Sequence, residues 1–294
     1  MTRIRSRHLR RSPRRAASSG WAAVLALGAL TAGCGAAPGP DVRARAAMYA
    51  GAGDYDRAAS ELRAAIAARP PAISERRLLI RILAARGDWG SARREAEALA
   101  VALGPASPIP WLELGHVSEL AHRYDDALAA YDRAAEVAPL DPAGPREGGM
   151  RAARWGEAEL AEPRLTEALR RAPGDAAAWH ALGLVRARLG ERSGARDAFR
   201  AGLRVDPHAL ENRLGLATLA LGEGDARAAL AEYELLIAAR PRLGDLRLGR
   251  ALALTLLERY DEAEAELARA EALGAARRAL AAQRALIARR RASR

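Results

Sequence analysis

Residues 125–139 read DDALAAYDRAAEVAP, and this stretch has the pattern of one amphipathic helix that ends at a proline. Its apolar residues, such as Ala127, Tyr131 and Ala134, recur every three or four positions and so share one helix face. Pro139 has no backbone N–H and cannot continue the helix. Similar segments end near three other prolines, so the same helix recurs along the chain: Pro70, Pro207 and Pro241.

The prolines follow a fixed period. Five of them lie 34 residues apart, and Pro70 precedes the first by 35: Pro105, Pro139, Pro173, Pro207 and Pro241. A period of this length is typical of repeat proteins that stack one small structural unit on the next. The abundance of Ala, Leu, Arg and Glu favours helix, and no stretch alternates apolar and polar residues as a strand does. We therefore predict an all-α fold.

The residues between the prolines narrow the type of repeat. Large and small side chains recur at fixed places in two segments: Trp111, Leu114, Gly115, Tyr131 and Ala134 in one, and Trp179, Leu182, Gly183, Ala195 and Phe199 in the other. This pattern resembles the tetratricopeptide repeat, a pair of antiparallel helices. Small residues let two helices approach, and large ones fill the space around the contact. The resemblance implies an α-solenoid of about seven helix pairs that stabilise one another by stacking.

The repeats divide the chain as follows. We place them at 39–72, 73–106, 108–141, 142–175, 176–209, 210–243 and 244–277, so that the array covers 39–277. Residues 278–294 form a basic capping helix in this division, with Leu280, Leu286 and Ile287 turned inward and arginines outward. Such a cap covers the apolar end of a stack and keeps it soluble.

The fourth repeat departs from the pattern. It carries Pro145, Gly148 and Gly149 in its first helix and Pro163 in its second. A proline inside a helix costs about 3 kcal/mol and a glycine up to about 1 kcal/mol. Two interpretations stay open: a degenerate repeat held in place by its neighbours, or a hinge that sets the curvature of the array.

The N-terminus has the order of a secretory signal. A basic leader precedes the apolar run Trp21–Gly33, which is too short to span a bilayer, and Cys34, the only cysteine, follows it. Residues 30–34, LTAGC, resemble a bacterial lipobox, although Thr31 stands where Leu is usual. The resemblance implies a signal peptide at 1–33, acylation of Cys34, and a short membrane tether at 34–38. The alternative is an unpaired thiol in an ordinary secreted protein.

Two further features bear on the location of the chain. Gly35 is not the Asp that retains lipoproteins at the inner membrane, so the same resemblance implies an outer membrane, with the protein facing the periplasm. The net charge of +11 lies at the chain ends, since residues 1–33 and 276–294 each hold seven arginines and no acid. The remaining residues carry −3, which argues against nucleic acid as a partner.

The sequence contains no recognisable catalytic motif. There is no second cysteine, no His-Glu-x-x-His, no Gly-x-Ser-x-Gly and no phosphate-binding loop. His116, His122 and Asp125 could be imagined as metal ligands, but six positions separate the two histidines on different helix faces. We therefore expect no enzyme activity, no metal and no cofactor.

The resemblance implies a binding surface instead, because the first helix of each tetratricopeptide pair lines a concave groove through positions 2, 5, 9 and 12. These positions give candidates for a peptide-binding groove: Arg43, Arg77, Arg81, Leu112, His116, Glu119, Arg146, Met150, His180, Leu184, Leu214, Thr218, Leu248 and Leu252. The N-terminal half of this surface is basic and the C-terminal half is apolar, which suits a peptide with an acidic end and an apolar end. Alternatively, the leucines pack under neighbouring repeats and the arginines are solvated. The chain has no Lys, and its one Asn, Asn212, falls outside these positions, so it lacks the residues that clamp a C-terminal carboxylate in some arrays.

The expected function is that of a non-enzymatic, lipid-anchored scaffold that recruits or assembles partner proteins in the bacterial cell envelope. A pilotin-like role for a type IV pilus secretin is one form of it. The alternative is an envelope protein that binds a glycan or small molecule in the groove, although the candidate positions hold no aromatic residue of the kind sugars stack on. The arginine-rich C-terminus could also contact anionic headgroups or an acidic polymer.

Overall fold

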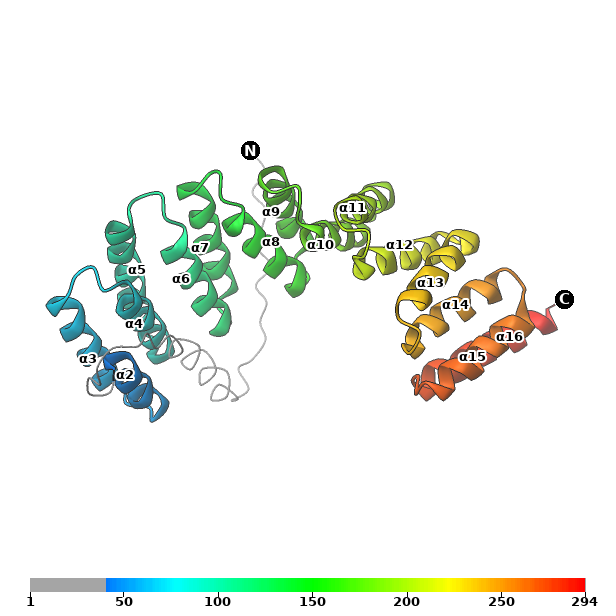
Figure 1. The fold of residues 1–294 in the computed structure, drawn as a ribbon, viewed down its shortest axis with the longest axis horizontal. Coiled ribbons are helices and arrows are strands. Elements are labelled where there is room, and N and C mark those ends of the chain that lie inside the picture. Colours follow the sequence, from blue (N-terminus) through cyan, green and yellow to red (C-terminus); the bar gives the residue numbers. More distant parts are fainter. Residues whose placement is uncertain (1–40, 294) are drawn as a thin grey trace. The chain divides into compact units, whose positions relative to one another are not determined.

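The computed structural model describes residues 41–293. They form fifteen helices, and no strand occurs within this range. Consecutive helices run antiparallel and pack as pairs (Figure 1). The prediction of an all-α fold with seven helix pairs and a capping helix is therefore confirmed. The predicted signal peptide at 1–33, Cys34 and the tether at 34–38 lie outside the described residues.

The chain divides into two compact units, and the first ends at Val137. Its described part consists of three helix pairs: α2 (Val42–Gly51) with α3 (Tyr55–Ala68), α4 (Ile73–Arg86) with α5 (Trp89–Leu103), and α6 (Ile109–Leu120) with α7 (Tyr124–Val137).

The second unit begins at Ala138 and contains four helix pairs and a single helix. The pairs are α8 (Ala143–Trp155) with α9 (Ala158–Arg171), α10 (Ala176–Arg188) with α11 (Arg192–Val205), α12 (Leu210–Glu223) with α13 (Ala226–Ala239), and α14 (Gly244–Leu256) with α15 (Tyr260–Ala272). The single helix α16 (Arg277–Ala292) follows them.

The turn inside each pair is set by one left-handed residue. Five of the seven turns use glycine, the residue that adopts positive φ without strain: Gly53, Gly87, Gly156, Gly190 and Gly224. His122 and Glu258 take the same conformation in the third and seventh pairs, with φ of 59° and 62°. An aspartate commonly follows the glycine and caps the second helix, as Asp225 does by accepting a hydrogen bond from the backbone of Ala228 at 3.0 Å.

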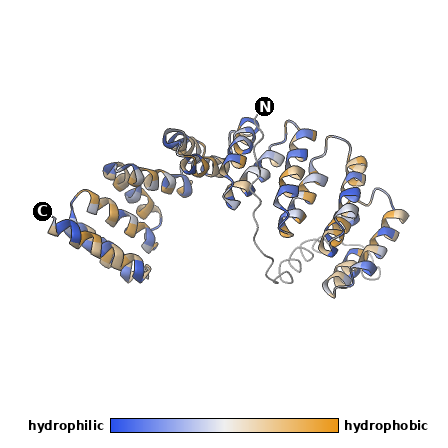
Figure 2. Ribbon diagram, turned by 180° about the vertical axis from the view of Figure 1, so that it is seen from behind, coloured by the Kyte–Doolittle hydropathy of each residue, from blue (hydrophilic) through white to orange (hydrophobic). Residues whose placement is uncertain are grey.

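Each pair is held by a large side chain packed against a small residue. A Cβ atom on Gly115 would lie within 2.5–2.8 Å of the ring of Tyr131, so only glycine fits there. Both Tyr131 and its counterpart Phe199 are almost fully buried. Hydrophobic and hydrophilic residues are interspersed along the described helices (Figure 2), and second helices such as α7 and α11 have one apolar side. The core is thus a series of buried apolar contacts between neighbouring helices.

The fourth pair forms two complete helices despite its prolines and glycines. Pro145 is the third residue of α8, where no intrahelical N–H bond is required. Gly149 allows a close approach, since a Cβ atom there would lie 2.9 Å from the backbone nitrogen of Leu165. Pro163 is the one proline inside a helix in this pair, and α9 continues through it. These residues are accommodated by local geometry, and the hinge remains a prediction.

Helix α16 covers the end of the second unit. Leu280 and Ile287 are buried, at 2% and 1% exposure, and belong to the same core as Leu254. The amide of Gln283 donates a hydrogen bond to the carbonyl of Leu248 in α14 at 3.0 Å. The helix therefore takes the place that the first helix of a further repeat would occupy.

Candidate functional site

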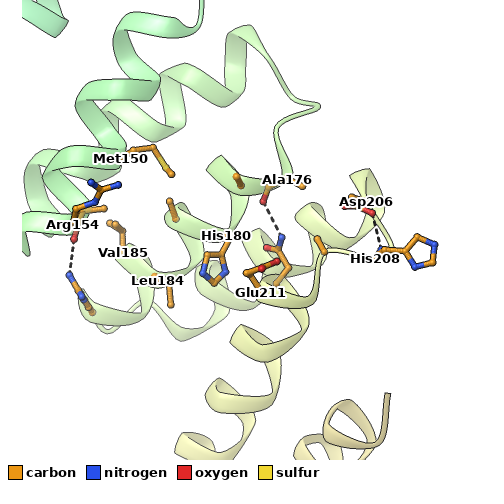
Figure 3. Close-up of a pocket in the computed structure, with 15 residues that line it drawn as sticks. Met150, Arg154, Ala176, His180, Leu184, Val185, Asp206, His208 and Glu211 are labelled. Atoms are coloured by element: carbon orange, nitrogen blue, oxygen red, sulfur yellow. Dashed lines mark hydrogen bonds between the residues drawn. The ribbon is translucent and has the colours of Figure 1, made fainter. Parts of the chain in front are cut away.

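The first helices of three successive pairs line a groove in the second unit. Helix α10 packs against both α8 and α12. Together they enclose a cavity of about 720 Å³ on the side away from the second helices (Figure 3). Its lining includes Met150 and Arg154 from α8, His180, Leu184 and Arg188 from α10, and Glu211 from α12.

A second cavity of about 410 Å³ continues the first. It shares His180, Leu184 and Glu211 with the larger cavity and adds Leu214 and Thr218 from α12. Leu184 and Leu214 are 44% and 40% exposed, which is unusual for leucines in the middle of a helical repeat. We call the two cavities together the α8–α12 groove.

Five residues predicted from the sequence meet in this groove: Met150, His180, Leu184, Leu214 and Thr218. They come together because a period of 34 residues places equivalent positions of successive first helices on one face. The other candidates in the second unit lie elsewhere. Arg146 binds Asp175 at 2.6 Å and Glu147 at 3.0 Å. Leu248 is buried beside α16, and Leu252 is partly buried.

The three arginine candidates in the first unit form ion pairs with acidic residues, which the sequence did not predict. Arg77 and Arg81 both bind Glu113 of the next pair, the former at 3.0 Å. Arg43 binds the helix-capping Asp41 at 2.8 Å. The expected basic surface is therefore reduced, because two guanidinium groups share one carboxylate and a third has its own partner.

The remaining candidates of the first unit, Leu112, His116 and Glu119, are partly buried on α6. The ring of His116 lies edge-on to that of Tyr131, with 5.7 Å between ring centroids.

Glu113 illustrates how burial and charge compete. Only 4% of this residue is exposed. Burial raises the pKa of its carboxyl group, but the hydrogen bonds and charges of Arg81 and Arg77 outweigh burial and leave the pKa below its ordinary value. Glu113 is therefore ionised at neutral pH and ties the second and third helix pairs together.

The charges along the α8–α12 groove are separated. Arg154 lies on α8 at one side of the groove, whereas Asp206 and Glu211 lie at the other side, near α12 (Figure 3). Arg188 donates a hydrogen bond to the carbonyl of Ala153 at 3.0 Å, and Asp206 accepts one from the backbone of His208 at 2.9 Å. Apart from Arg192, which borders the second cavity at the start of α11, the groove has a basic side, an apolar floor and an acidic side.

His180 lies between these two sides. Burial lowers the pKa of its imidazole, and the nearby charge of Glu211 opposes this shift only in part. The ring is therefore neutral at pH 7. Its Nδ1 atom is buried without a hydrogen-bond partner among the described residues. The ring packs against Phe199, with 5.8 Å between centroids.

Sequence analysis missed several groove residues. Glu211 occupies position 2 of the sixth repeat, so the positional rule could have included it. Arg154 and Arg188 are separated by one period of 34 and share a position just beyond the rule. Asn212 was expected outside the groove, and this expectation is wrong. It lines the cavity, and its amide donates to the carbonyl of Ala176 at 3.0 Å.

The first unit has a different cavity of about 410 Å³, lined by α5, α6 and α7. It contains Trp89 and Trp111, which the sequence did not mark as site residues. The guanidinium of Arg123 lies 4.7 Å from the centre of the Trp89 ring, and that of Arg133 lies 5.7 Å from Trp111. Each indole is thus already in contact with a cation of the same chain.

A metal site in residues 41–293 would need several ligand side chains close together. Within that range no three His, Cys, Asp or Glu side chains are grouped so that they could hold a metal ion. His122 lies at a turn, with its Nδ1 3.0 Å from the hydroxyl of Tyr124. Among the described helices, none has the length and apolar character needed to cross a membrane.

Several solved structures are similar to this chain. The C-terminal part of a tetratricopeptide-repeat-containing protein of Cytophaga hutchinsonii aligns with a TM-score of 0.61 and 16% identity, over 82% of this chain and 98% of that part. Pseudomonas aeruginosa pilF aligns with a TM-score of 0.54 and 19% identity, over 72% and 96%. PilW, a widely conserved type IV pilus biogenesis factor, gives 0.52 and 16%, over 69% and 94%.

No protein-family model matches the sequence, and no curated protein matches it. At these identities the similarity concerns the fold alone. The neighbours, the period of 34 residues and the helix pairs agree with one another. The fold of this chain is therefore that of a tetratricopeptide-repeat α-solenoid.

Proposed function

We propose that this chain is a non-enzymatic scaffold that binds a partner protein through the α8–α12 groove. The observation that carries the proposal is the open apolar floor formed by Leu184 and Leu214, which are 44% and 40% exposed. Exposed apolar surface rimmed by charges is typical of protein-binding sites. The convergence of five groove candidates on the two cavities of this groove supports the same interpretation.

The scaffold is anchored in the bacterial cell envelope through acylated Cys34, at an outer membrane and facing the periplasm. This part of the proposal rests on the basic leader, the apolar run and the sequence LTAGC at 30–34. Since two or three acyl chains anchor a protein stably, no membrane-spanning helix is needed.

A pilotin-like role for a type IV pilus secretin is the specific form we favour. Its support is the combination of a lipid-anchor sequence with a chain made of repeats, and the similarity in fold to PilW and pilF. In a host with such a secretin, deletion of the gene should reduce secretin multimers. Normal multimers in the deletion strain would exclude this role and leave the general scaffold proposal in place.

The groove itself is tested by a matched pair of substitutions. Leu184→Arg places a charge on the groove floor, whereas Leu235→Arg changes a leucine on the second helix α13 that is 53% exposed. After cross-linking in the native host, Leu184→Arg should lose the protein adduct that the wild type forms, and Leu235→Arg should retain it. Equal adducts in both variants would refute the groove as the binding surface.

A further inference from the structure

Two charged side chains on opposite sides of the α8–α12 groove have no charged partner among the described residues. Arg154 of α8 and Glu211 of α12 are both exposed, and neither has an ion pair or a hydrogen bond to another residue in the described range. Several arginines of the second unit differ, as Arg146, Arg186, Arg213 and Arg247 bind carboxylates. An unpaired cation and an unpaired anion at the two sides of one groove provide charge complementarity for a ligand with the opposite arrangement.

The part of the groove between these charges favours a peptide main chain. Leu184 and Leu214 offer apolar floor on which side chains can pack. His180 stands among them, and neither of its ring nitrogens has a hydrogen bond to a described residue. A neutral imidazole is one donor and one acceptor, and each peptide group of an extended chain offers both. The peptide groups of a helix are already bonded to one another and offer neither.

The spacing of the charges follows from the packing of the helices. Helix α8 packs on α10 and α10 on α12, so two helix-to-helix steps separate Arg154 from Glu211. Each step is about 8–10 Å, and the two together are about 16–20 Å across the helices. Arg154 lies near the C-terminal end of α8 and Glu211 near the N-terminal end of α12, which adds about 16 Å along the helix axes, so the two residues are about 23–26 Å apart. An extended chain advances about 3.3 Å per residue and covers this span in about seven or eight residues, whereas a helix needs about fifteen or more.

We infer that the groove binds an extended segment of the partner protein in which an acidic and a basic side chain lie about seven or eight positions apart and flank apolar residues. The acidic side chain pairs with Arg154, the basic one with Glu211, and a main-chain group pairs with His180. This inference rests on the proposed function and specifies the chemistry of the partner. It does not fix the direction of the bound segment, so the acidic residue can precede or follow the basic one in the sequence of the partner.

The test uses fluorescently labelled ten-residue peptides and the full-length chain purified in detergent, with binding followed by anisotropy. The peptides share a Leu- and Ala-containing centre and differ only in the two flanking residues, which are Glu and Arg, Glu and Glu, or Arg and Arg. The wild type should prefer the Glu/Arg peptide by at least about ten-fold in Kd, which corresponds to about 1.4 kcal/mol. A peptide of the same composition with Glu adjacent to Arg should bind less tightly by a similar factor.

Reversing the charge of one groove residue at a time tests the charge pattern specifically, whichever direction the peptide binds in. Arg154→Glu presents two acidic groups and should prefer the Arg/Arg peptide, whereas Glu211→Arg presents two basic groups and should prefer the Glu/Glu peptide. Both residues are exposed, so these variants should fold, and circular dichroism checks that they do. The inference is overturned if the wild type binds none of the peptides or if all three proteins rank them alike. If the peptides fail in this way but Leu184→Arg still loses the cellular adduct, the charge pattern is wrong and the proposed groove function stands. If Leu184→Arg keeps the adduct, the proposed function is wrong as well.

Discussion

Gly183 lies directly against the ring of Phe199, so a Cβ atom at position 183 would overlap that ring. The contact joins α10 to α11, and Phe199 in turn lies against Gly215 of the next pair and borders the α8–α12 groove. One aromatic ring therefore fixes the spacing of three helices that shape the site.

Gly183→Ala should destabilise the protein because the added methyl group forces Phe199 to move within a packed core. Overpacking of this kind costs about 1–3 kcal/mol, measured as a shift in the urea midpoint. Gly222→Ala is the matched control, since Gly222 lies in α12 with nothing within 4 Å of an added Cβ atom. It should be neutral or stabilise by up to about 1 kcal/mol. Equal effects of the two substitutions would contradict the proposed packing.

Pro163→Ala should stabilise the second unit. Pro163 is exposed and lies inside α9, where it removes one intrahelical hydrogen bond. Alanine restores that bond, and the gain in the free energy of unfolding should reach up to about 3 kcal/mol. Hydrogen exchange of residues 158–171 measures it locally. Unchanged protection there would show that the proline is fully compensated by its surroundings.

Glu113→Gln should weaken the first unit. The carboxylate binds Arg77 and Arg81 and is buried, so its loss should cost about 2 kcal/mol at pH 7. Because the folded pKa of Glu113 lies below the ordinary value of 4.5, its stabilisation is complete above pH 4.5 and is lost as the pH falls through the folded pKa. The difference from wild type should therefore shrink at low pH.

A surface ion pair provides the control for Glu113. Glu97 lies 3.4 Å from Arg93, and its side chain is 52% exposed. Glu97→Gln should change the free energy of unfolding by less than about 0.5 kcal/mol, because solvent screens exposed pairs. Urea titrations at pH 7 and below pH 4 distinguish the two sites. A loss in Glu113→Gln no larger than that in Glu97→Gln would refute the latch between the second and third helix pairs.

His180 should titrate below its ordinary pKa of 6.5, as followed by NMR of its ring protons, because burial disfavours the charged imidazole. Below pH 6.5 the unfolded chain then binds more protons than the folded one, so His180 reduces stability as the pH falls from 6.5 toward the folded pKa. His180→Gln should remove this part of the pH dependence. Glu211→Gln should lower the titration midpoint further, since the charge of Glu211 raises the pKa. A midpoint at or above 6.5 would contradict the buried position of the ring.

The fold was predictable because its determinants are local and periodic. Prolines 34 residues apart and the recurring large and small residues specify helix pairs without reference to distant contacts. Pro145 shows the limit of this reasoning. Its position in the repeat predicts a disrupted helix, but α8 begins at Ala143, and a shift of a few residues in a helix start removes the penalty.

The candidate site was predictable only where the register of the repeat alone determines which residues share one face. Register places His180, Leu184 and Leu214 on one face, and all three line the groove. It cannot show that Arg77 and Arg81 reach a glutamate more than thirty residues away, because that contact depends on side-chain conformation across two helix pairs. Nor does it show that Asn212 reaches Ala176, which lies one repeat earlier.

The anchor has its own test. Cys34→Ser removes the acylated thiol and should move the protein from the membrane fraction to the soluble fraction on cell fractionation, because the remaining chain has no lipid. A variant at a neighbouring position outside the resemblance, such as Ala37→Ser, should stay in the membrane fraction. Membrane retention of Cys34→Ser would exclude the lipid anchor.

The central claim is that the α8–α12 groove holds the partner protein, and site-specific photo-cross-linking tests it most directly. A photoreactive amino acid is placed singly at Leu184, at Leu214 or at Leu235, three exposed leucines of the second unit, in the full-length chain in its native host. We predict the same discrete adduct from positions 184 and 214 and none from position 235. An adduct that forms at 235 but at neither groove position would contradict the account.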